Sequence, residues 1–411
     1  MAGLRPVRAC GLANGLARNS IRPIRCATAV KASPMAQAQI RCKSGPYGYT
    51  QAKSLVFSEY GEPKDVLQLH THSISPSLPS SSVLLRALAA PINPADVNTI
   101  QGTYGAKPSF TSLLGTASPA AVPGNEGAFE VVSSSTPEFQ KGDWVIPKKT
   151  MFGTWRTHAL VPGDAVIKVD KEGVTPLQAA TVAVNPCSAY RMLRDFVKEP
   201  TPMREGDWFV QNGANSGVGR AAIQLGALWG YRSINVIRAR DTDEATQALK
   251  DELTSLGATH VVTEDEFLAR EFRDRLAEWT RGDREGVRLG MNCVGGKSAQ
   301  TMAKCLGQGG TLVTYGGMAR QPVALPTGLL IFKDIRFVGF WLSRWADRDP
   351  ASKEQTVAEI LGLTREGKFR DVPTVEVPWT WDTEVQELKD AVQGTLEGFR
   401  SGKGVFVFRD T

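Results

Sequence analysis

The sequence predicts an α/β protein with two domains, a doubly wound parallel sheet and a β-rich domain, and three observations support this prediction. The chain has 411 residues, which is about two to three times the length of a typical domain. Residues 54–185 consist mainly of short β-branched or aromatic runs separated by Gly, Pro and Ser. From about residue 186, strand-like runs alternate with helical segments, which is typical of a parallel sheet covered by helices on both faces.

The first 49 residues are rich in Arg, Ala and Ser and contain no acidic residue. This composition is typical of a mitochondrial or chloroplast presequence. A disordered basic tail is the alternative, but the acid-free stretch is long and ends where strand-like sequence begins, at residues 52–57, which favours the presequence. We expect cleavage between about residues 40 and 52.

The net charge of +6 comes from the start of the chain. Residues 1–53 hold nine of the 48 basic residues and no acidic one, so the remaining 39 basic residues face 42 acidic ones, a net charge of −3. This mildly acidic balance argues against a nucleic-acid-binding protein. No apolar run approaches the ~20 residues that a membrane-spanning helix requires.

The predicted elements follow a division into a presequence (1–49), a β-rich domain (50–185), a nucleotide-binding domain (186–346) and a return to the first domain (347–411). In the β-rich domain we expect strands over 83–89, 129–132, 144–147 and 165–169. In the nucleotide-binding domain we expect strands over 208–212, 234–237, 259–263, 287–293, 311–315 and 335–341, and helices over 216–229, 243–256, 270–279 and 298–306. The last segment adds helices over 354–365 and 385–392 and strands over 374–378 and 404–408.

A glycine-rich turn with Gly213, Gly217 and Gly219 lies between the strand at 208–212 and the helix at 216–229. In such a unit the first glycine allows the tight turn, the second lets the backbone approach a pyrophosphate, and the third lets the helix pack closely on the sheet. The phosphates then face N–H groups at the helix N-terminus. A glycine pattern alone is not specific, but the strand–turn–helix context predicts a dinucleotide site. Its residues are Asn215, Ser216, Gly217 and Val218.

The end of the second strand indicates which dinucleotide binds. An NAD site places Asp or Glu there to hold the ribose 2′-hydroxyl. This chain instead has Arg238, Ala239 and Arg240, and two arginines suit a 2′-phosphate. The segment therefore predicts NADPH as the cofactor, unless both arginines are simply solvated.

Several sequence blocks occur in a fixed order. They are Pro-Ile-Asn-Pro-Ala-Asp-Val-Asn-Thr-Ile-Gln-Gly-Thr-Tyr at 91–104, Gly-Thr-Trp-Arg at 153–156, Val-Asn-Pro at 184–186, Asn-Ser-Gly-Val-Gly at 215–219, Thr-Tyr-Gly-Gly-Met at 314–318 and Gly-Phe-Trp-Leu-Ser at 339–343. In these blocks the chain resembles the mitochondrial 2-enoyl thioester reductases, over nearly all of residues 53–411. They belong to the medium-chain dehydrogenase/reductase superfamily, so the resemblance implies a Rossmann cofactor domain and a GroES-like catalytic domain. Ala239 departs from the pattern, because relatives often have an acidic residue there.

Many members of that superfamily bind zinc through Cys, His or carboxylate ligands. This chain has only four histidines, its cysteines are not clustered, and Asn125 stands where zinc-binding relatives have a histidine. We therefore expect no metal, so that the chemistry depends on an organic acid and the nicotinamide.

The resemblance implies that Tyr104 donates the proton. A hydride from NADPH attacks C3 of an enoyl thioester, and C2 must then be protonated. A phenol remains protonated at neutral pH and is therefore available as the acid, and general acid catalysis contributes about 10²–10⁴ in rate. The alternative for Tyr104 is a loop aromatic residue that covers the cleft.

The resemblance implies further cofactor contacts. They are Asn185, Tyr315, Gly316, Gly317, Met318, Phe340, Trp341, Leu342 and Lys403. Asn185 is expected to order Tyr104 or the nicotinamide ribose. Most of these residues also have a structural alternative. It is an Asn-Pro turn for Asn185, turn geometry for the two glycines, core packing for residues 340–342 and a solvated side chain for Lys403.

These features together predict a mitochondrial matrix enzyme that uses NADPH to reduce trans-2-enoyl thioesters of acyl carrier protein or CoA in fatty-acid synthesis. The resemblance supplies the pathway, the carrier and a homodimer, in which the last strand of the nucleotide sheet is a plausible pairing edge. One alternative is an NADPH:quinone reductase of the same superfamily, which would not need a tyrosine acid at position 104. The other is a catalytically inactive NADPH-binding regulatory protein, against which Tyr104, the glycines and the arginines argue.

Overall fold

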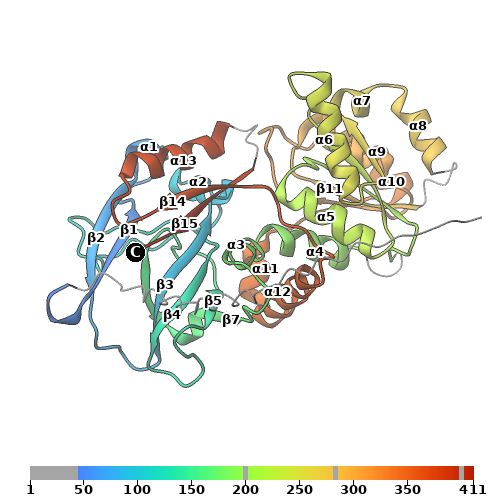
Figure 1. Ribbon diagram of the computed structural model, residues 1–411. Helices are drawn as coiled ribbons and strands as arrows, with labels where there is room; N and C mark the ends of the chain where they lie inside the picture. Colours follow the sequence, from blue (N-terminus) through green and yellow to red (C-terminus); the bar gives the residue numbers. More distant parts are fainter. Residues whose placement is uncertain (1–44, 198–201, 281–285, 398–401) are drawn as a thin grey trace, which may run out of the picture. The chain divides into compact units, whose positions relative to one another are not determined.

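The computed structural model describes residues 45–197, 202–280, 286–397 and 402–411 and contains two large sheets (Figure 1). Residues 1–44 of the predicted presequence lie outside the described residues. One sheet has six strands and is parallel throughout, and the other has seven strands and is mostly antiparallel. This architecture confirms the predicted α/β class with a separate β-rich part. No helix in the described ranges is long and apolar enough to cross a membrane.

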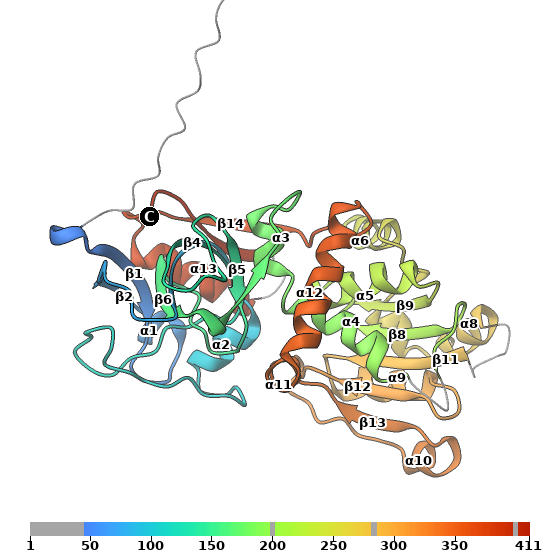
Figure 2. The same cartoon turned by 90° about the horizontal axis from the view of Figure 1, so that it is seen from below.

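The parallel sheet has the order β10-β9-β8-β11-β12-β13. Its strands are β8 (Trp208–Asn212), β9 (Arg232–Ile237), β10 (His260–Thr263), β11 (Val287–Asn292), β12 (Thr311–Thr314) and β13 (Arg336–Gly339). The order reverses direction between β8 and β11, and in doubly wound sheets a ligand binds at the carboxyl ends of the strands at this point. β13 lies at one edge of the sheet, next to α10 (Thr327–Lys333), as Figure 2 shows.

Five of the described helices accompany this sheet, and a side chain caps the start of three of them. The five helices are α5 (Gly217–Leu228), α6 (Asp243–Ser255), α7 (Glu264–Leu268), α8 (Phe272–Trp279) and α9 (Gly296–Cys305). Ser216, Thr242 and Thr263 each accept an N–H from the first turn of the helix that follows. The predicted helices therefore lie within two residues of the observed starts, while the five-residue α7 and the seven-residue α10 were not expected.

The β-rich sheet combines two distant parts of the chain. Its strands are β3 (Ser82–Pro91), β4 (Ala128–Ser134), β5 (Trp144–Pro147), β6 (His158–Pro162), β7 (Val166–Val169), β14 (Thr374–Trp379) and β15 (Lys403–Phe408). β15 pairs antiparallel with β3, so the C-terminal strands join this sheet (Figure 1). Trp379 and Phe406 pack edge to face with ring centroids 5.3 Å apart in its core. A separate pair of antiparallel strands, β1 (Thr50–Val56) and β2 (Gln68–Ile74), precedes it.

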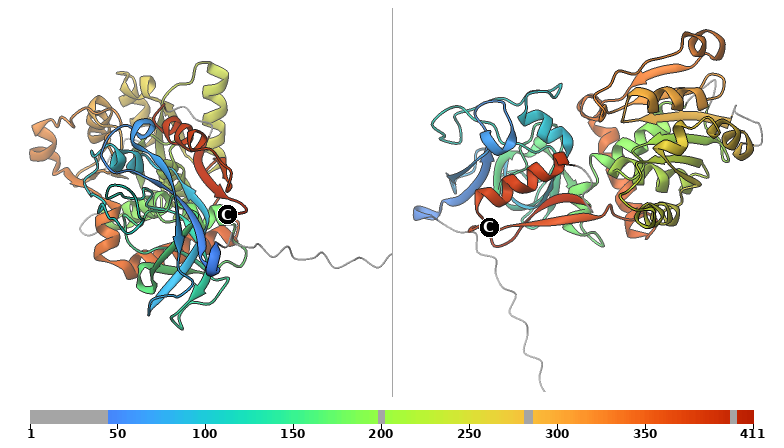
Figure 3. Two further views of the ribbon diagram at one scale, coloured as in Figure 1. Left: turned by 90° about the vertical axis from the view of Figure 1, so that its left-hand side faces the viewer. Right: turned by 90° about the horizontal axis from the view of Figure 1, so that it is seen from above.

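Helices α1 (Pro63–Val66), α2 (Pro94–Ile100), α3 (Pro176–Thr181), α4 (Asn185–Asp195), α11 (Leu342–Arg348), α12 (Pro350–Arg365) and α13 (Val385–Glu397) complete the described structure. α4 packs against α5 and α12, and α13 lies along β15 (Figure 3). Five of these helices have proline in the first turn, where its missing N–H costs nothing. The proposed domain boundary at residues 185–186 falls at the start of α4, and that at residues 346–347 falls within α11.

The buried His158 in β6 makes stability depend on pH. Its side chain is 1% exposed. Burial, with a smaller effect of Arg86 and then His72, lowers its pKa to about 4. The unfolded chain binds a proton at this histidine below pH ~6.5 and the folded chain does not, so the stability is present above pH ~6.5 and is lost as the pH falls toward 4.

We expect His158→Gln to remove this dependence. Between pH 7 and pH 5 the wild type should lose about 2 kcal/mol more unfolding free energy than the variant. Urea unfolding at the two pH values measures the difference. Equal losses in the two proteins would show that His158 does not remain neutral in the folded state.

Candidate active site

Tyr104 follows the C-terminal end of α2 and meets the segment that leaves the parallel sheet. The carbonyl of Asn98 accepts the backbone N–H groups of Thr103 and Tyr104 at 2.9 and 3.0 Å, which fixes the turn after the helix. The Tyr104 hydroxyl accepts a hydrogen bond from Nε1 of Trp341 at 2.8 Å and lies 3.2 Å from the Ser343 hydroxyl. The Tyr104 and Trp341 rings meet edge to face, with centroids 5.8 Å apart.

These contacts orient the Tyr104 proton. The indole N–H can only donate, so the phenolic oxygen is the acceptor in its contact with Trp341. The hydroxyl proton is then free to point toward Ser343 or toward a ligand. A pocket opens beside this hydroxyl. It is lined by Ala106, Thr150, Trp341, Ser343, Arg344, Asp347 and Arg348.

The glycine-rich turn has the geometry that a dinucleotide requires. Gly213 has a φ of +61°, and a β-carbon there would lie 2.6 Å from the Cys293 sulfur. A β-carbon on Gly219 would collide with the backbone of Ala214, so glycine is needed for the helix to start so close to the turn. The Ser216 hydroxyl accepts the N–H of Gly219 at 3.1 Å. The N–H groups of the first two helical residues, 217 and 218, have no partner within the helix.

Asn185 contacts the same turn from α4. It is the first residue of that helix and is followed by Pro186. A β-carbon on Gly217 would collide with the Asn185 amide, so the space beside Gly217 is occupied by this side chain. The structure therefore gives Gly217 a second reason to be glycine, besides approach to a pyrophosphate. The backbone carbonyl of Asn215 accepts the Arg220 Nε at 3.0 Å.

Residues 315–318 follow β12 and lie against Cys293. The Tyr315 hydroxyl is buried, and in the described residues it has no well-formed hydrogen bond. Burial, with the adjacent Cys293 thiol, raises its pKa well above the usual range. Gly316 packs on Cys293, whereas a β-carbon on Gly317 would meet open space, and Met318 is exposed. A buried hydroxyl without a well-formed hydrogen bond fits a bound polar ligand.

The two arginines after β9 lie close to each other. Arg238 is exposed and Arg240 is half-buried. The pKa of Arg240 lies below its usual range, first because of burial and then because of the nearby Arg238 and Arg220 charges. Arg220 forms an ion pair with Glu252, with Nη1 2.6 Å from Oε1. Ala239, between the two arginines, is exposed and leaves space beside them.

Phe340 and Leu342 differ from Trp341 in their surroundings. Phe340 packs edge to face on Phe196, with ring centroids 5.6 Å apart, and Leu342 packs on the same apolar core. Trp341 is exposed and lines the pocket beside Tyr104. The apolar run therefore supplies both core packing and pocket surface.

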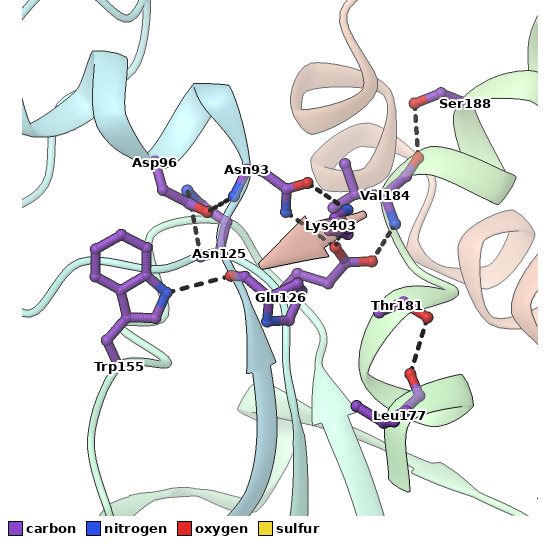
Figure 4. Close-up of polar contacts among 11 residues, drawn as sticks. Asn93, Asp96, Asn125, Glu126, Trp155, Leu177, Thr181, Val184, Ser188 and Lys403 are labelled. Carbon is purple, nitrogen blue, oxygen red and sulfur yellow. Dashed lines mark hydrogen bonds and ion pairs between the residues drawn. The ribbon is translucent and has the colours of Figure 1, made fainter. Parts of the chain in front are cut away.

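Lys403 lies in a buried polar cluster (Figure 4). Its Nζ donates to Oδ1 of Asn93 at 2.6 Å and lies 3.7 Å from Oε2 of Glu126. Asp96 belongs to the same cluster, and burial raises its pKa to about 6. The sequence alone indicated no role for Asn93, Glu126 or Asp96. The capping box of Asn93 and Asp96 could be predicted from their spacing in the sequence. The contacts of Glu126 could not be predicted in this way.

Asn125 also belongs to this cluster. Its Nδ2 donates to Oδ1 of Asp96 at 2.8 Å, and its Oδ1 accepts the N–H of Met151 at 2.7 Å. The amide thus bridges two segments through one donor and one acceptor bond. In the described parts of the chain, no three His, Cys, Asp or Glu side chains are grouped so as to hold a metal ion.

Comparison with known proteins places the chain in a family. Residues 217–360 match the protein family described as zinc-binding dehydrogenase. The mitochondrial enoyl-[acyl-carrier-protein] reductase of Yarrowia lipolytica is 46% identical over 351 residues, covering 84% of this chain and 89% of that protein. The human protein of the same name is 41% identical over 359 residues, covering 86% and 88%.

Solved structures agree with these relatives. The mitochondrial 2-enoyl thioester reductase Etr1p/Etr2p heterodimer from Candida tropicalis matches with a TM-score of 0.81 and 38% identity, covering 87% of this chain and 99% of that one. A complex of Etr1p with NADP and crotonyl-CoA gives the same values. A putative NADPH:quinone reductase from Bacillus thuringiensis, at 23% identity and a TM-score of 0.71, shares the fold. The chain belongs to the family of mitochondrial enoyl-[acyl-carrier-protein] reductases.

Proposed function

We propose that this protein is a mitochondrial enoyl thioester reductase, which uses NADPH to convert trans-2-enoyl thioesters into saturated acyl thioesters. The observation that carries the proposal is the Tyr104 hydroxyl, which accepts the Trp341 N–H at 2.8 Å beside a pocket next to the exit of the parallel sheet. The related Etr1p has been solved with NADP and crotonyl-CoA. The relatives are mitochondrial proteins, and the acid-free, Arg-rich start of the chain agrees with import into the matrix.

The residues of the nucleotide turn fit NADPH. When bound, this cofactor supplies the hydride that attacks C3 of the enoyl thioester. The N-terminus of α5 holds the pyrophosphate through the N–H groups of Gly217 and Val218. Arg238 and Arg240 hold the 2′-phosphate. The buried Tyr315 hydroxyl gains a polar partner from the bound cofactor.

Tyr104 provides the proton for C2. Because Trp341 donates to the phenolic oxygen, the hydroxyl proton points away from the indole and is available to Ser343 or to a ligand. The same N–H stabilises the negative charge that develops on the oxygen as the proton leaves. Tyr104 therefore acts as the general acid.

The pocket beside Tyr104 suits a thioester with an anionic carrier. Arg344 and Arg348 line it and are exposed, and they are one turn apart on α11. Both acyl carrier protein and CoA carry their acyl chain on phosphopantetheine, so a phosphate is present in either substrate. Two guanidinium groups at the pocket favour such a phosphate.

An assay of residues 50–411 tests the proposal. We expect oxidation of NADPH with crotonyl-CoA, slower oxidation of NADH, and no comparable rate with a quinone. Rapid turnover of a quinone with no turnover of crotonyl-CoA would identify a quinone reductase instead. NADPH should also raise the melting temperature, because a ligand that binds the folded state stabilises it.

We also propose a homodimer that forms through the edge of the parallel sheet. β13 lies at that edge, and the adjacent α10 exposes Leu330, Ile331 and Phe332 with exposed fractions of 48%, 66% and 78%. Three exposed apolar side chains beside an edge strand favour a second copy of the chain as the partner. One related structure is a heterodimer of two similar chains.

Phe332→Asp is expected to convert the dimer into a monomer, because a carboxylate in an apolar interface loses its hydration without gaining a partner. Light scattering after size-exclusion chromatography measures the mass. Leu113→Asp, which changes another exposed apolar residue, serves as the control and should leave the mass unchanged. A wild type that elutes as a monomer at micromolar concentration would disprove the dimer.

A further inference from the structure

The carboxylate of Glu126 joins three segments that are far apart in the sequence (Figure 4). Its Oε1 accepts the backbone N–H of Val184 at 2.8 Å, and its Oε2 accepts Nδ2 of Asn93 at 3.0 Å. Oε2 also lies 3.7 Å from Nζ of Lys403. Glu126 is 1% exposed, so these protein groups replace the water that its charge would otherwise need.

The contact with Asn93 connects Glu126 to the segment that carries Tyr104. Asn93 is the N-cap of α2, and its backbone N–H donates to Oδ2 of Asp96 at 2.9 Å. The helix is only seven residues long, and its Asn98 carbonyl holds the N–H of Tyr104 at 3.0 Å. The position of Asn93 therefore determines where Tyr104 lies.

The contact with Val184 connects Glu126 to the segment that packs against the nucleotide turn. Val184 immediately precedes Asn185, the first residue of α4. The Asn185 amide occupies the space beside Gly217 at the start of α5. Holding the N–H of Val184 therefore holds Asn185 against the turn that receives the dinucleotide.

We propose that Glu126 is a positioning residue that sets the separation between Tyr104 and the nucleotide turn, and thus between the proton donor and the hydride donor. This inference rests on the proposed function. No other described side chain links both branches through hydrogen bonds of this kind. A displacement of about 1 Å between reacting groups is enough to lower a rate by roughly a hundredfold.

The charges around Glu126 explain why a neutral amide cannot replace it. The cluster holds the carboxylates of Glu126 and Asp96 and the ammonium of Lys403, and burial lowers the pKa of Lys403 while Glu126 and then Asp96 oppose this. Three donors, from Val184, Asn93 and Lys403, face the two oxygens of Glu126. A glutamine has one oxygen and adds two N–H donors, so it cannot satisfy all three.

Glu126→Gln tests the proposal through hydrogen exchange and through turnover. We expect amide exchange, followed by mass spectrometry, to become at least about fivefold faster in both peptides 93–104 and 182–190, because both lose an anchor. With crotonyl-CoA and NADPH, kcat should fall at least about tenfold. Both measurements use residues 50–411 well below the melting temperature.

Glu130→Gln is the matched control. Glu130 lies four residues further along, in β4, and pairs with the buried Arg86 at 3.3 Å. This variant also leaves a buried cation without its carboxylate, but Glu130 contacts neither branch. It should lower the melting temperature while leaving kcat and the exchange of both peptides unchanged.

Asn93→Ser provides a second variant in case Glu126→Gln does not fold. Serine keeps a helix cap but cannot reach Glu126, so exchange should increase in peptide 93–104 and not in 182–190. Two results for Glu126→Gln would overturn the inference. One is amide exchange that is unchanged in either peptide, and the other is a kcat within twofold of the wild-type value. If the wild type does not reduce crotonyl-CoA, the proposed function fails, while the exchange of the two peptides still decides the role of Glu126.

Discussion

Replacing Tyr104 with phenylalanine is expected to lower kcat for crotonyl-CoA by about 10²–10⁴, which corresponds to roughly 3–5 kcal/mol of transition-state stabilisation. The substitution removes only the hydroxyl that accepts the Trp341 N–H and contacts Ser343. Protonation of C2 then has to come from water, which lacks the fixed orientation of the phenol. Steady-state rates of NADPH oxidation measure the loss.

The ring itself should remain in place, because its edge-to-face contact with Trp341 involves no hydroxyl. We therefore expect NADPH to bind Tyr104→Phe as tightly as the wild type, as measured by the quenching of protein fluorescence. A fall in kcat with unchanged cofactor affinity separates lost chemistry from a disturbed fold.

Tyr60→Phe is a suitable control for this substitution. Tyr60 also lies in the β-rich part and packs edge to face on Phe110, with ring centroids 5.4 Å apart. It does not contact the Tyr104 hydroxyl, so kcat should stay at the wild-type value. If Tyr104→Phe retained more than half of the wild-type turnover, Tyr104 would not be the general acid.

The parallel sheet could be predicted from sequence because short apolar and β-branched runs alternate with helical segments. β8 was predicted at residues 208–212 and is found there, and all five of its residues are buried. The short helices were harder, because α2, α3, α10 and α11 have six or seven residues, less than two full turns. Helices this short show no clear periodicity. The local signals for α2 and α3 were proline in the first turn and a capping box, Asn93 with Asp96 and Thr175 with Gln178.

The candidate site also has a part that could be predicted from sequence and a part that could not. The glycine-rich turn is local, so the roles of Gly213 and Gly219 follow from the sequence around them. The resemblance implied that Tyr104 and Trp341 both belong to the site, but the contact between these residues, 237 positions apart, was found only in the structure. Glu126 was missed because its partners Val184, Asn93 and Lys403 are far from it in the sequence, and no local sequence pattern predicts that they come together.

Replacing both Arg238 and Arg240 with glutamine is expected to raise KM for NADPH about a hundredfold and to leave KM for NADH nearly unchanged. Charge-assisted hydrogen bonds contribute about 1.5–3 kcal/mol each, and solvent screening of the exposed Arg238 reduces this sum toward the ~2.7 kcal/mol that a hundredfold change represents. Each single variant should show a smaller loss. The ratio of kcat/KM for the two cofactors measures the change.

The position of the pair supports a 2′-phosphate as its ligand. The arginines directly follow β9, where a ribose-binding carboxylate lies in NAD sites. The Arg240 pKa is lowered by burial and then by Arg238, so the two positive charges repel each other. An anion placed near both would relieve that repulsion, which NADPH can do and NADH cannot.

Arg232→Gln removes a positive charge from the opposite end of the same strand, where Arg232 stacks over Trp208 at 5.4 Å from the ring centroid. It should leave the preference for NADPH intact, which separates a local phosphate contact from a general loss of positive charge. If the double variant at 238 and 240 kept the wild-type ratio between the cofactors, the 2′-phosphate would have to bind elsewhere. Because NADH lacks only that phosphate, the comparison isolates this one contact from every other interaction of the dinucleotide.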